Sequence, residues 1–349
     1  MVYKLDGGKV IDDNNNLFVE NLYTGEITTF TIERGKTEGF TSGGLYSPPT
    51  VRYNTIDKFP FASDANATDH GDLFYAITVA SSHSTATDGY TAAGANPSLP
   101  GGLYDNHHIQ KFPFASNTGS SDVGDVVTGW STDVAGTSSL SHGYIAGGNA
   151  PQYPEGGFGT DVIQKFQFSN SSNSVDIAGL TVGRYSAASQ TSTTHGYTSG
   201  GWNPAAPYAT PALVFTDIID KFPFSSDANA SDVGDLSLGR YDMQGGQSGE
   251  HGYTAGGVNP GNPLGTPVVK VIDRFPFASD GNAADIGDVY GETYEFATQS
   301  AQTHGYLSGG RTLANYLNII QKYAFSNSAN AADVGDLTQV RGNNMGHQV

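Results

Sequence analysis

The sequence lacks several features that would point to particular classes of protein. It has no cysteine, so it can form neither a disulfide bond nor a thiolate metal site. Only 16 of its 349 residues are lysine or arginine, against 34 that are aspartate or glutamate, and the net charge of −18 disfavours nucleic acids and anionic membranes. No apolar run is long enough to span a bilayer, and residues 1–6 lack the apolar core of a signal peptide. We therefore expect no nucleic-acid partner, no membrane insertion and assembly inside the cell.

Apolar residues at helical spacing are also absent over any useful length. Aromatic and β-branched residues instead occur in short runs bounded by Gly, Asn, Asp, Ser and Pro, which is typical of strands joined by turns. Glycine is abundant, with 46 residues, and charged residues make up only 14% of the chain. This composition indicates a rigid, loop-rich all-β protein rather than a disordered one.

A short phrase, most often His-Gly-Tyr, returns six times along the chain. Its glycine recurs at intervals of 50 to 56 residues, which indicates that one module was repeated six times. In most copies the phrase is soon followed by Gly-Gly. The six glycines are Gly39, Gly89, Gly143, Gly196, Gly252 and Gly305.

A second phrase keeps step with the first. It consists of versions of Ile-x-Lys-Phe-x-Phe, as at residues 56–61 and 219–224, and is followed by an Asp/Asn-rich stretch and a version of Asp-Val-Gly-Asp-Leu. Each module therefore holds four strand-length segments: a variable segment A, segment B with the first phrase, segment C with the paired aromatics, and a short segment D. Four antiparallel strands in a repeat of this length are typical of a propeller blade. We predict an all-β fold, a six-bladed β-propeller.

The two ends of the repeat predict how the ring closes. The first module begins at Gly39 with segment B and has no segment A before it, while residues 342–349 follow the last segment D. We predict that residues 342–349 supply the innermost strand of the first blade, because an unpaired strand edge would otherwise remain. Residues 37–349 then form the propeller. Residues 1–36 form an N-terminal arm, which is either an attachment segment or an ordinary extension packed on the ring.

The order of the segments resembles the kelch repeat: a strand ending in double glycine, an aromatic-bearing strand after a variable loop, then a short strand leading to an arginine such as Arg184. The resemblance covers residues 37–349, but it departs from kelch in having only two tryptophans, Trp130 and Trp202. The amino-acid sequence of the repeats also looks like that of repeats in virion structural proteins of marine tailed phages that infect cyanobacteria. This second resemblance implies a virion protein that is assembled in the host cytoplasm.

The segments between B and C differ most among the modules. In an up-and-down blade these B–C loops emerge on the same face as the D–A connections, whereas the A–B and C–D turns emerge on the opposite face. We expect one variable face and one nearly constant, acidic face. Aromatic rings beside a few polar groups suit sugar rings or a protein epitope, although such rings can also simply pin long loops. The candidate ligand-binding residues on the variable face are Tyr46, Tyr104, Tyr153, Phe158, Trp202, Tyr208, Tyr316, Arg184, Arg240 and Arg341.

Other chemistry is less favoured by the repeats. Asp-rich stretches such as residues 64–72 offer oxygen ligands of the kind calcium prefers, but Asx-capped turns explain the same residues. The histidine that begins four B segments, for example His195, is expected to be a hydrogen-bonded turn residue, because equivalent positions lie far apart around a ring. The three arginines fall where kelch-like repeats commonly carry arginine, rather than forming a sialidase-type site. We therefore predict no catalytic residue, no metal and no cofactor.

The sequence thus favours a non-catalytic virion structural protein that binds a cell-surface receptor or glycan as part of a phage tail, fibre or surface decoration. Its partners would be other virion proteins, through residues 1–36, and a host glycan or protein. The main alternative is a purely structural virion subunit whose propeller docks onto neighbouring proteins. A third alternative is a secreted glycan-active enzyme.

Overall fold

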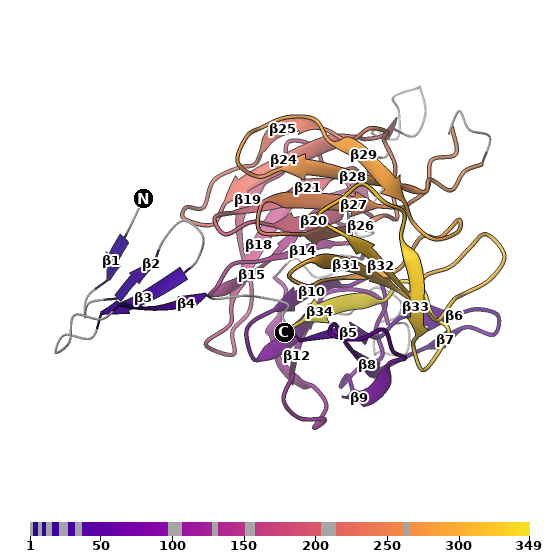
Figure 1. Cartoon of the computed structure of the whole chain (residues 1–349), viewed down its shortest axis with the longest axis horizontal. Coiled ribbons are helices and arrows are strands. Elements are labelled where there is room, and N and C mark those ends of the chain that lie inside the picture. The colour runs from indigo at the N-terminus through magenta and orange to yellow at the C-terminus, as the bar shows by residue number, and fades with distance from the viewer. Residues whose placement is uncertain are drawn as a thin grey trace.

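The computed structural model shows six four-stranded antiparallel sheets arranged around an axis, which confirms the predicted six-bladed β-propeller (Figure 1). None of the residues it describes lies in a helix. The structure describes residues 3–5, 9–11, 16–20, 27–31, 37–96, 107–127, 132–150, 158–203, 214–261 and 266–349.

Each blade, numbered I to VI, has strands A, B, C and D in order from the axis outward. From blade I to blade VI, the A strands are β34 (Met345–Gln348), β10 (Ser81–Ser84), β14 (Ala135–Ser138), β20 (Ala188–Thr191), β26 (Gln244–Gln247) and β30 (Ala297–Ser300). The B strands are β5 (Glu38–Ser42), β11 (Asp88–Ala92), β15 (His142–Ala146), β21 (His195–Ser199), β27 (His251–Ala255) and β31 (His304–Ser308). The C strands are β8 (Thr55–Pro60), β12 (His108–Pro113), β18 (Val162–Gln167), β24 (Ile218–Pro223), β28 (Val271–Pro276) and β32 (Ile319–Ala324). The D strands are β9 (Thr68–Asp72), β13 (Ser121–Asp125), β19 (Val175–Gly179), β25 (Ser231–Asp235), β29 (Ala284–Asp288) and β33 (Ala332–Asp336).

The ring closes through the C-terminal strand β34, as predicted. This strand pairs antiparallel with β5, so that Met345 lies opposite Ser42. The backbone N–H of Thr37 donates to the carbonyl of Val349 over 2.9 Å. The two ends of the ring therefore meet at one A–B turn.

Aromatic residues join neighbouring blades. The tyrosine of strand B packs against both aromatics of strand C in the next blade, as Tyr144 does against Phe222 and Phe224, with ring centroids 5.7 and 4.8 Å away. The same contact recurs at the other five interfaces, with Phe40 in place of tyrosine in blade I. The glycine of the His-Gly-Tyr phrase leaves room for a ring of its own blade, since a Cβ at Gly89 would lie 2.4 Å from Phe112. Both repeated phrases are thus explained by packing between and within blades.

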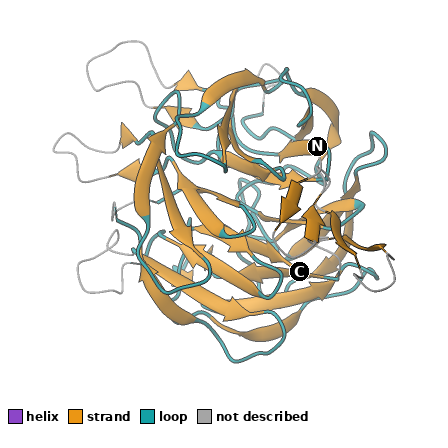
Figure 2. Cartoon of the chain, turned by 90° about the vertical axis from the view of Figure 1, so that its left-hand side faces the viewer, coloured by secondary structure: helices purple, strands orange, loops and turns teal. Residues whose placement is uncertain are grey.

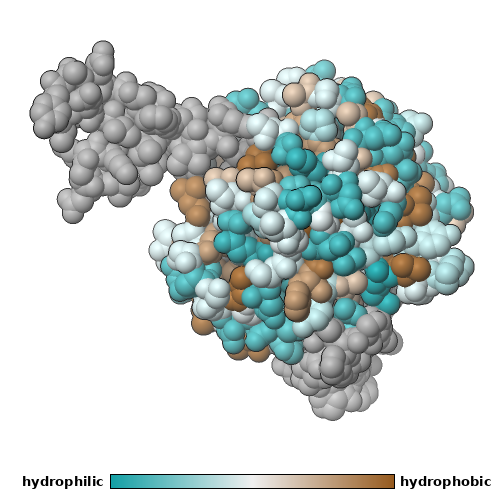
Figure 3. All heavy atoms as spheres, turned by 90° about the horizontal axis from the view of Figure 1, so that it is seen from below, coloured by the Kyte–Doolittle hydropathy of each residue, from teal (hydrophilic) through white to brown (hydrophobic). Residues whose placement is uncertain are grey.

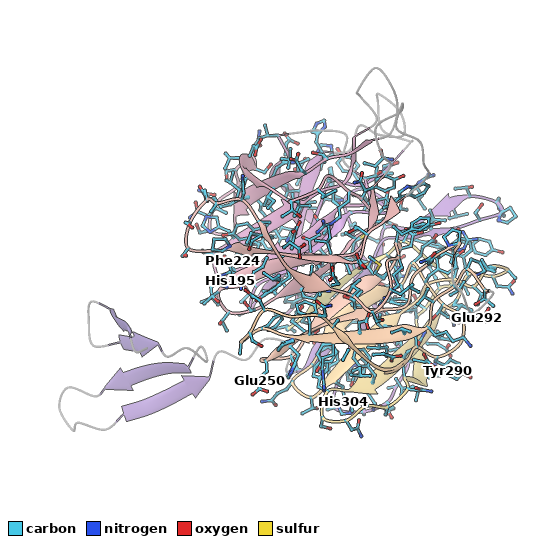
Figure 4. All side chains as sticks on the ribbon, turned by 90° about the horizontal axis from the view of Figure 1, so that it is seen from above. His195, Phe224, Glu250, Tyr290, Glu292 and His304 are labelled. Carbon is cyan, nitrogen blue, oxygen red and sulfur yellow. The ribbon has the colours of Figure 1, made fainter. Side chains whose placement is uncertain are left out.

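The ring has two faces of different construction. We call the side of the A–B and C–D turns the turn face, and the side of the B–C loops and D–A connections the loop face. In Figure 4, His195 and His304, which begin B strands, lie on one side of the ring, and Tyr290 and Glu292, which follow strand β29, lie on the other. Within the described residues, three B–C loops carry two-stranded hairpins: β6 (Leu45–Tyr46) with β7 (Val51–Arg52), β16 (Asn149–Ala150) with β17 (Phe158–Gly159), and β22 (Trp202–Asn203) with β23 (Val214–Phe215).

The N-terminal strands form an antiparallel sheet of their own. Among the described residues, this sheet shares no hydrogen-bonded strand with the ring. Because Thr37 lies at an A–B turn, the chain leaves the ring from the turn face. Figure 2, which views the molecule from that side, shows the strands of the arm in front of the ring. These strands are β1 (Tyr3–Leu5), β2 (Lys9–Ile11), β3 (Asn16–Glu20) and β4 (Ile27–Thr31).

Candidate functional site

The three arginines predicted for ligand binding lie inside the ring rather than on its surface. All three are 0% exposed, and each pairs with an aspartate in strand C of the next blade. Burial lowers the pKa of each guanidinium, and the paired carboxylate opposes that shift. A ligand on the surface cannot reach them, so the candidate site described below does not include them. The pairs and their N–O distances are Arg184–Asp220 (3.0 Å), Arg240–Asp273 (2.9 Å) and Arg341–Asp57 (2.6 Å).

The other three blades replace both members of this ion pair. Glutamine stands at the aspartate position in strand C, and the D–A connection that reaches it carries no arginine at the corresponding position. The amide takes over the contact: in blade II, Gln110 accepts the backbone N–H of Tyr75 over 2.9 Å. Aspartate therefore occurs only where arginine occurs. This covariation among the modules is visible in the sequence, and our sequence analysis missed it. The glutamines are Gln110, Gln164 and Gln321.

Where the D–A connections reach the axis, six equivalent residues close a circle of backbone hydrogen bonds. Each residue donates its N–H to the carbonyl of its counterpart in the neighbouring connection, with N–O distances of 2.8 to 3.3 Å. All six have a left-handed φ between 52° and 58°, which is uncommon for residues other than glycine. We call this circle the collar. Its members are Val79, Asp133, Ser186, Asp242, Glu295 and Asn343.

The collar carries three carboxylates with raised pKa values. Burial raises the pKa of Asp133, and hydroxyl hydrogen bonds oppose that shift. Burial, followed by repulsion from Glu295 and Asp133, raises the pKa of Asp242 well above its usual value. Burial raises the pKa of Glu295 to about 7, although the charge of Arg311 acts in the opposite direction. Acidic groups that are held together against their own repulsion often mark a functional site.

An aromatic cluster flanks the collar on one side. Trp202 stacks on Tyr185, with ring centroids 5.5 Å apart, and also contacts Tyr241 at 5.2 Å. Phe215 stacks on Tyr241 at 5.3 Å. The residues Tyr185 and Tyr241 each directly precede a collar residue, and Trp202 and Tyr185 exchange two backbone hydrogen bonds. All four side chains are partly exposed, so the cluster offers aromatic surface beside the collar. We call Tyr185, Trp202, Phe215 and Tyr241 the aromatic cluster.

A second cluster, formed by an arginine and tyrosine rings, lies on the other side of Glu295. The guanidinium of Arg311 lies over the rings of Tyr294 and Tyr316, 5.4 and 5.0 Å from their centroids, and 4.0 Å from a carboxylate oxygen of Glu295. Tyr46 packs edge-on against Tyr316 at 5.6 Å. The structure thus places Tyr46 and Tyr316 together, as the loop-face prediction expected, and adds Arg311, which sequence reasoning did not single out.

The remaining predicted residues cannot be compared with the aromatic cluster. Tyr104, Tyr153 and Tyr208 lie outside the described residues. For Phe158 only the backbone is described, and it lies in the hairpin strand β17. Their proposed contribution to ligand binding stays a prediction.

The turn face is built from equivalent contacts between blades. In three interfaces a lysine of strand C pairs with an aspartate of the next C–D turn, as Lys165 does with Asp227 at 2.6 Å. An asparagine of the same turn accepts a backbone N–H from the preceding D strand; Asn66, for example, accepts from Asp336 over 3.1 Å. These contacts account for the residues that calcium would use. Within the described ranges, no group of three or more His, Asp or Glu residues is arranged to hold a metal ion.

The recurring histidines also serve the turns. The imidazole Nδ1 of His195 lies 2.8 Å from the hydroxyl of Thr194, and His142 and His304 make the equivalent contact. The prediction of hydrogen-bonded turn histidines is confirmed for these three. In the view of Figure 3, hydrophobic residues are scattered among hydrophilic ones rather than gathered in one patch.

The axis holds a polar cavity lined by the six A strands. Its hydroxyl and amide groups bond around the ring: the backbone N–H of Gln348 donates to Ser84 over 3.2 Å, and that of Ser84 donates to Ser138 over 3.4 Å. These oxygens are therefore already engaged. The collar and the aromatic cluster form a better candidate site, because their partly exposed groups face the loop side of the axis.

These observations define the protein as a six-bladed β-propeller with a polar, partly aromatic mouth on its loop face. A solved structure described as "Structure of YjhT" is similar, with a TM-score of 0.62 over 78% of this chain and 88% of that chain, at 12% sequence identity. At this identity the similarity shows the fold alone. No protein-family model and no curated protein matches the sequence. Among the described residues, no helix is long and apolar enough to cross a membrane.

Proposed function

We propose that this protein is a non-catalytic structural protein of a phage virion, and that its loop face binds a glycan or another receptor on the host surface. The resemblance of the repeats to kelch repeats and to virion proteins of cyanobacterial phages motivates the biological setting. The aromatic cluster beside the collar supports the binding role. Aromatic faces stack on sugar rings, and carboxylates accept hydrogen bonds from sugar hydroxyl groups.

The position of the chain ends supports an attachment role for the N-terminal arm. Because Thr37 and Val349 meet at a turn of the turn face, an arm anchored in a particle would leave the loop face directed away from it. This arrangement suits a module of a tail, fibre or surface decoration. Other virion proteins would then bind residues 1–36.

The interior supports a non-catalytic role. A sialidase-type site would need its arginines to touch the substrate, but Arg184, Arg240 and Arg341 are 0% exposed and paired with aspartates. These arginines are better explained as supports for the connections that carry the collar.

Adsorption of the labelled, purified protein to cells of marine cyanobacteria, and to polysaccharide extracted from their envelopes, tests the proposal. We expect saturable binding to both materials from at least one host, without release of sugar fragments. Fragment release would favour the alternative of a glycan-active enzyme. Binding to none of the cells, together with a virion image in which the loop face is covered by another protein, would favour the purely structural subunit.

A further inference from the structure

A small cavity lies at the axis of the ring, beside the collar. It is lined by all six collar residues and by residues that directly follow them along the chain, such as Ala80, Val134 and Asn344. The polar side chains that line it are Asp133, Ser186, Asp242, Gln244, Glu295, Asn343 and Asn344. The collar residues come from six different modules, so this site exists only because the ring is closed.

The cavity holds more hydrogen-bond acceptors than donors. The hydroxyl of Thr132 donates to Asp133 over 2.8 Å, and that of Ser186 lies 3.4 Å from the same carboxylate. The cation that acts on these carboxylates is Arg311, which lies 4.0 Å from Glu295 and lowers the pKa of both Asp242 and Glu295 against the larger effect of burial. Three carboxylates thus face one guanidinium, which is itself partly engaged by the two tyrosine rings.

Two buried acceptors, on residues that line the cavity, have no donor within the described part of the chain. Asn344 is only 4% exposed, and its Oδ1 has no hydrogen-bond partner among the described residues, while its Nδ2 is held by the carbonyl of Ser308 over 3.0 Å. The Oε2 of Glu295 is also buried without a partner in that part of the chain. Buried acceptors are rarely left without a donor, so an occupant of the cavity should supply N–H or O–H groups.

From these contacts we propose that the cavity binds the primary ammonium group of an amino sugar. An ammonium group carries three donors and one positive charge, which matches a site with excess acceptors and excess negative charge. The sugar ring then lies against the aromatic cluster, where Trp202 and Tyr241 present partly exposed faces. A metal ion fits less well, because no three carboxylates among the described residues are close enough together to coordinate one ion. This inference rests on the proposed glycan-binding function and specifies its ligand class.

Oligomers of glucosamine, compared with the same oligomers after N-acetylation, test this inference in calorimetric titrations near neutral pH, where a neutral amine can also take up a proton from a carboxyl group of the cavity on binding. The two probes share the ring and differ at the nitrogen, which carries a charge only in the first. We expect the glucosamine oligomer to bind at least about tenfold more tightly, the effect expected for a charged hydrogen bond. Methylamine should compete weakly if the ammonium group is the recognised element.

Substitutions test whether the carboxylates of the collar bind the glucosamine oligomer. Asp242→Asn should weaken binding of the glucosamine oligomer by about tenfold, while its stability stays equal or rises, because the change removes repulsion with Glu295 and Asp133. Glu295→Gln is the second variant. Asp280→Asn, on the turn face, removes the same charge and should leave binding unchanged.

Equal affinity for the acetylated and free oligomers, no binding of the free oligomer, or an equal loss in Asp280→Asn would overturn the inference. The proposed function would survive these outcomes if envelope polysaccharide still bound in a Trp202-dependent manner. Loss of that dependence would defeat the proposed function instead.

Discussion

The two faces of this ring are made from the same six modules and differ in how freely the modules vary. On the turn face, lysine–aspartate pairs and asparagine side chains repeat from blade to blade and join neighbours. On the loop face, the collar has five different residue types at its six positions, and its neighbours range from Trp202 to Arg311. The difference indicates that one face assembles the ring and the other is free to acquire a binding surface.

The largest expected effect comes from removing the strand that closes the ring. Deleting residues 342–349 removes β34, exposes the edge of β5 and removes Asn343 from the collar. We expect loss of cooperative thermal unfolding or a much lower melting temperature by circular dichroism. Deletion of residues 1–36 is the matched truncation and should leave the melting of the ring nearly unchanged. Similar melting of both truncated proteins would show that closure does not hold the ring together.

The second-largest loss of stability is expected when a buried ion pair beneath the loop face is broken. Asp57→Asn leaves the fully buried guanidinium of Arg341 without its counter-charge. We expect a loss of about 3–5 kcal/mol in the free energy of unfolding, measured by chemical denaturation. The control is Gln321→Glu, which introduces a carboxylate in a blade without the arginine and should also destabilise. A neutral outcome for both would mean that the pairing of aspartate with arginine has no energetic basis.

The buried histidines of the A strands predict that the stability of the protein depends on pH. Burial lowers the pKa of His83 to about 3 and that of His347 to about 4, from an ordinary value of 6.5. The unfolded chain then binds more protons than the native one between these values, so stability falls as the pH drops below about 6.5, by about 1.4 kcal/mol per pH unit for each histidine. Glutamine occupies the equivalent position at Gln190 and Gln299. A His83→Gln, His347→Gln double variant should lose less stability on acidification, and an unchanged pH profile would contradict this assignment.

The smallest effect is expected on the turn face. Lys322→Met removes an ion pair with Asp64 whose side chains are 24% and 53% exposed. Exposed pairs of this kind contribute about 0–1 kcal/mol, so the denaturation midpoint should hardly move. A loss comparable to that of Asp57→Asn would show that the turn face carries more of the stability than we infer.

The fold could be predicted from sequence because each signal for it is local or periodic. The Gly-Tyr and Phe-x-Phe phrases repeat where blades pack, and the missing first segment A implies closure by the C-terminus. The sequence also predicted that Arg184 lies in a D–A connection. It did not predict that the side chain points into the ring, because that depends on the ion pair with Asp220 in the next blade.

The collar could not be predicted from the sequence in the same way. The backbone is left-handed at Val79 and Glu295, but neither residue is a glycine, so the sequence gives no sign of this conformation. We also expected equivalent positions to lie far apart, which holds at the rim, whereas at the axis they meet in one circle. The carboxylates of Asp133 and Asp242 therefore converge through the symmetry of the ring and not through spacing in the sequence.

The most direct test of the account compares one substitution on each face for binding to host envelope polysaccharide. Trp202→Ala removes the centre of the aromatic cluster, whereas Leu140→Ala removes an apolar side chain, 50% exposed, from an A–B turn of the turn face. With both variants shown to be folded, dissociation constants should reveal a loss of about 2 kcal/mol or more for Trp202→Ala and no change for Leu140→Ala. Equal affinities for the two variants, or a larger loss for Leu140→Ala, would contradict the claim that the loop face recognises the host.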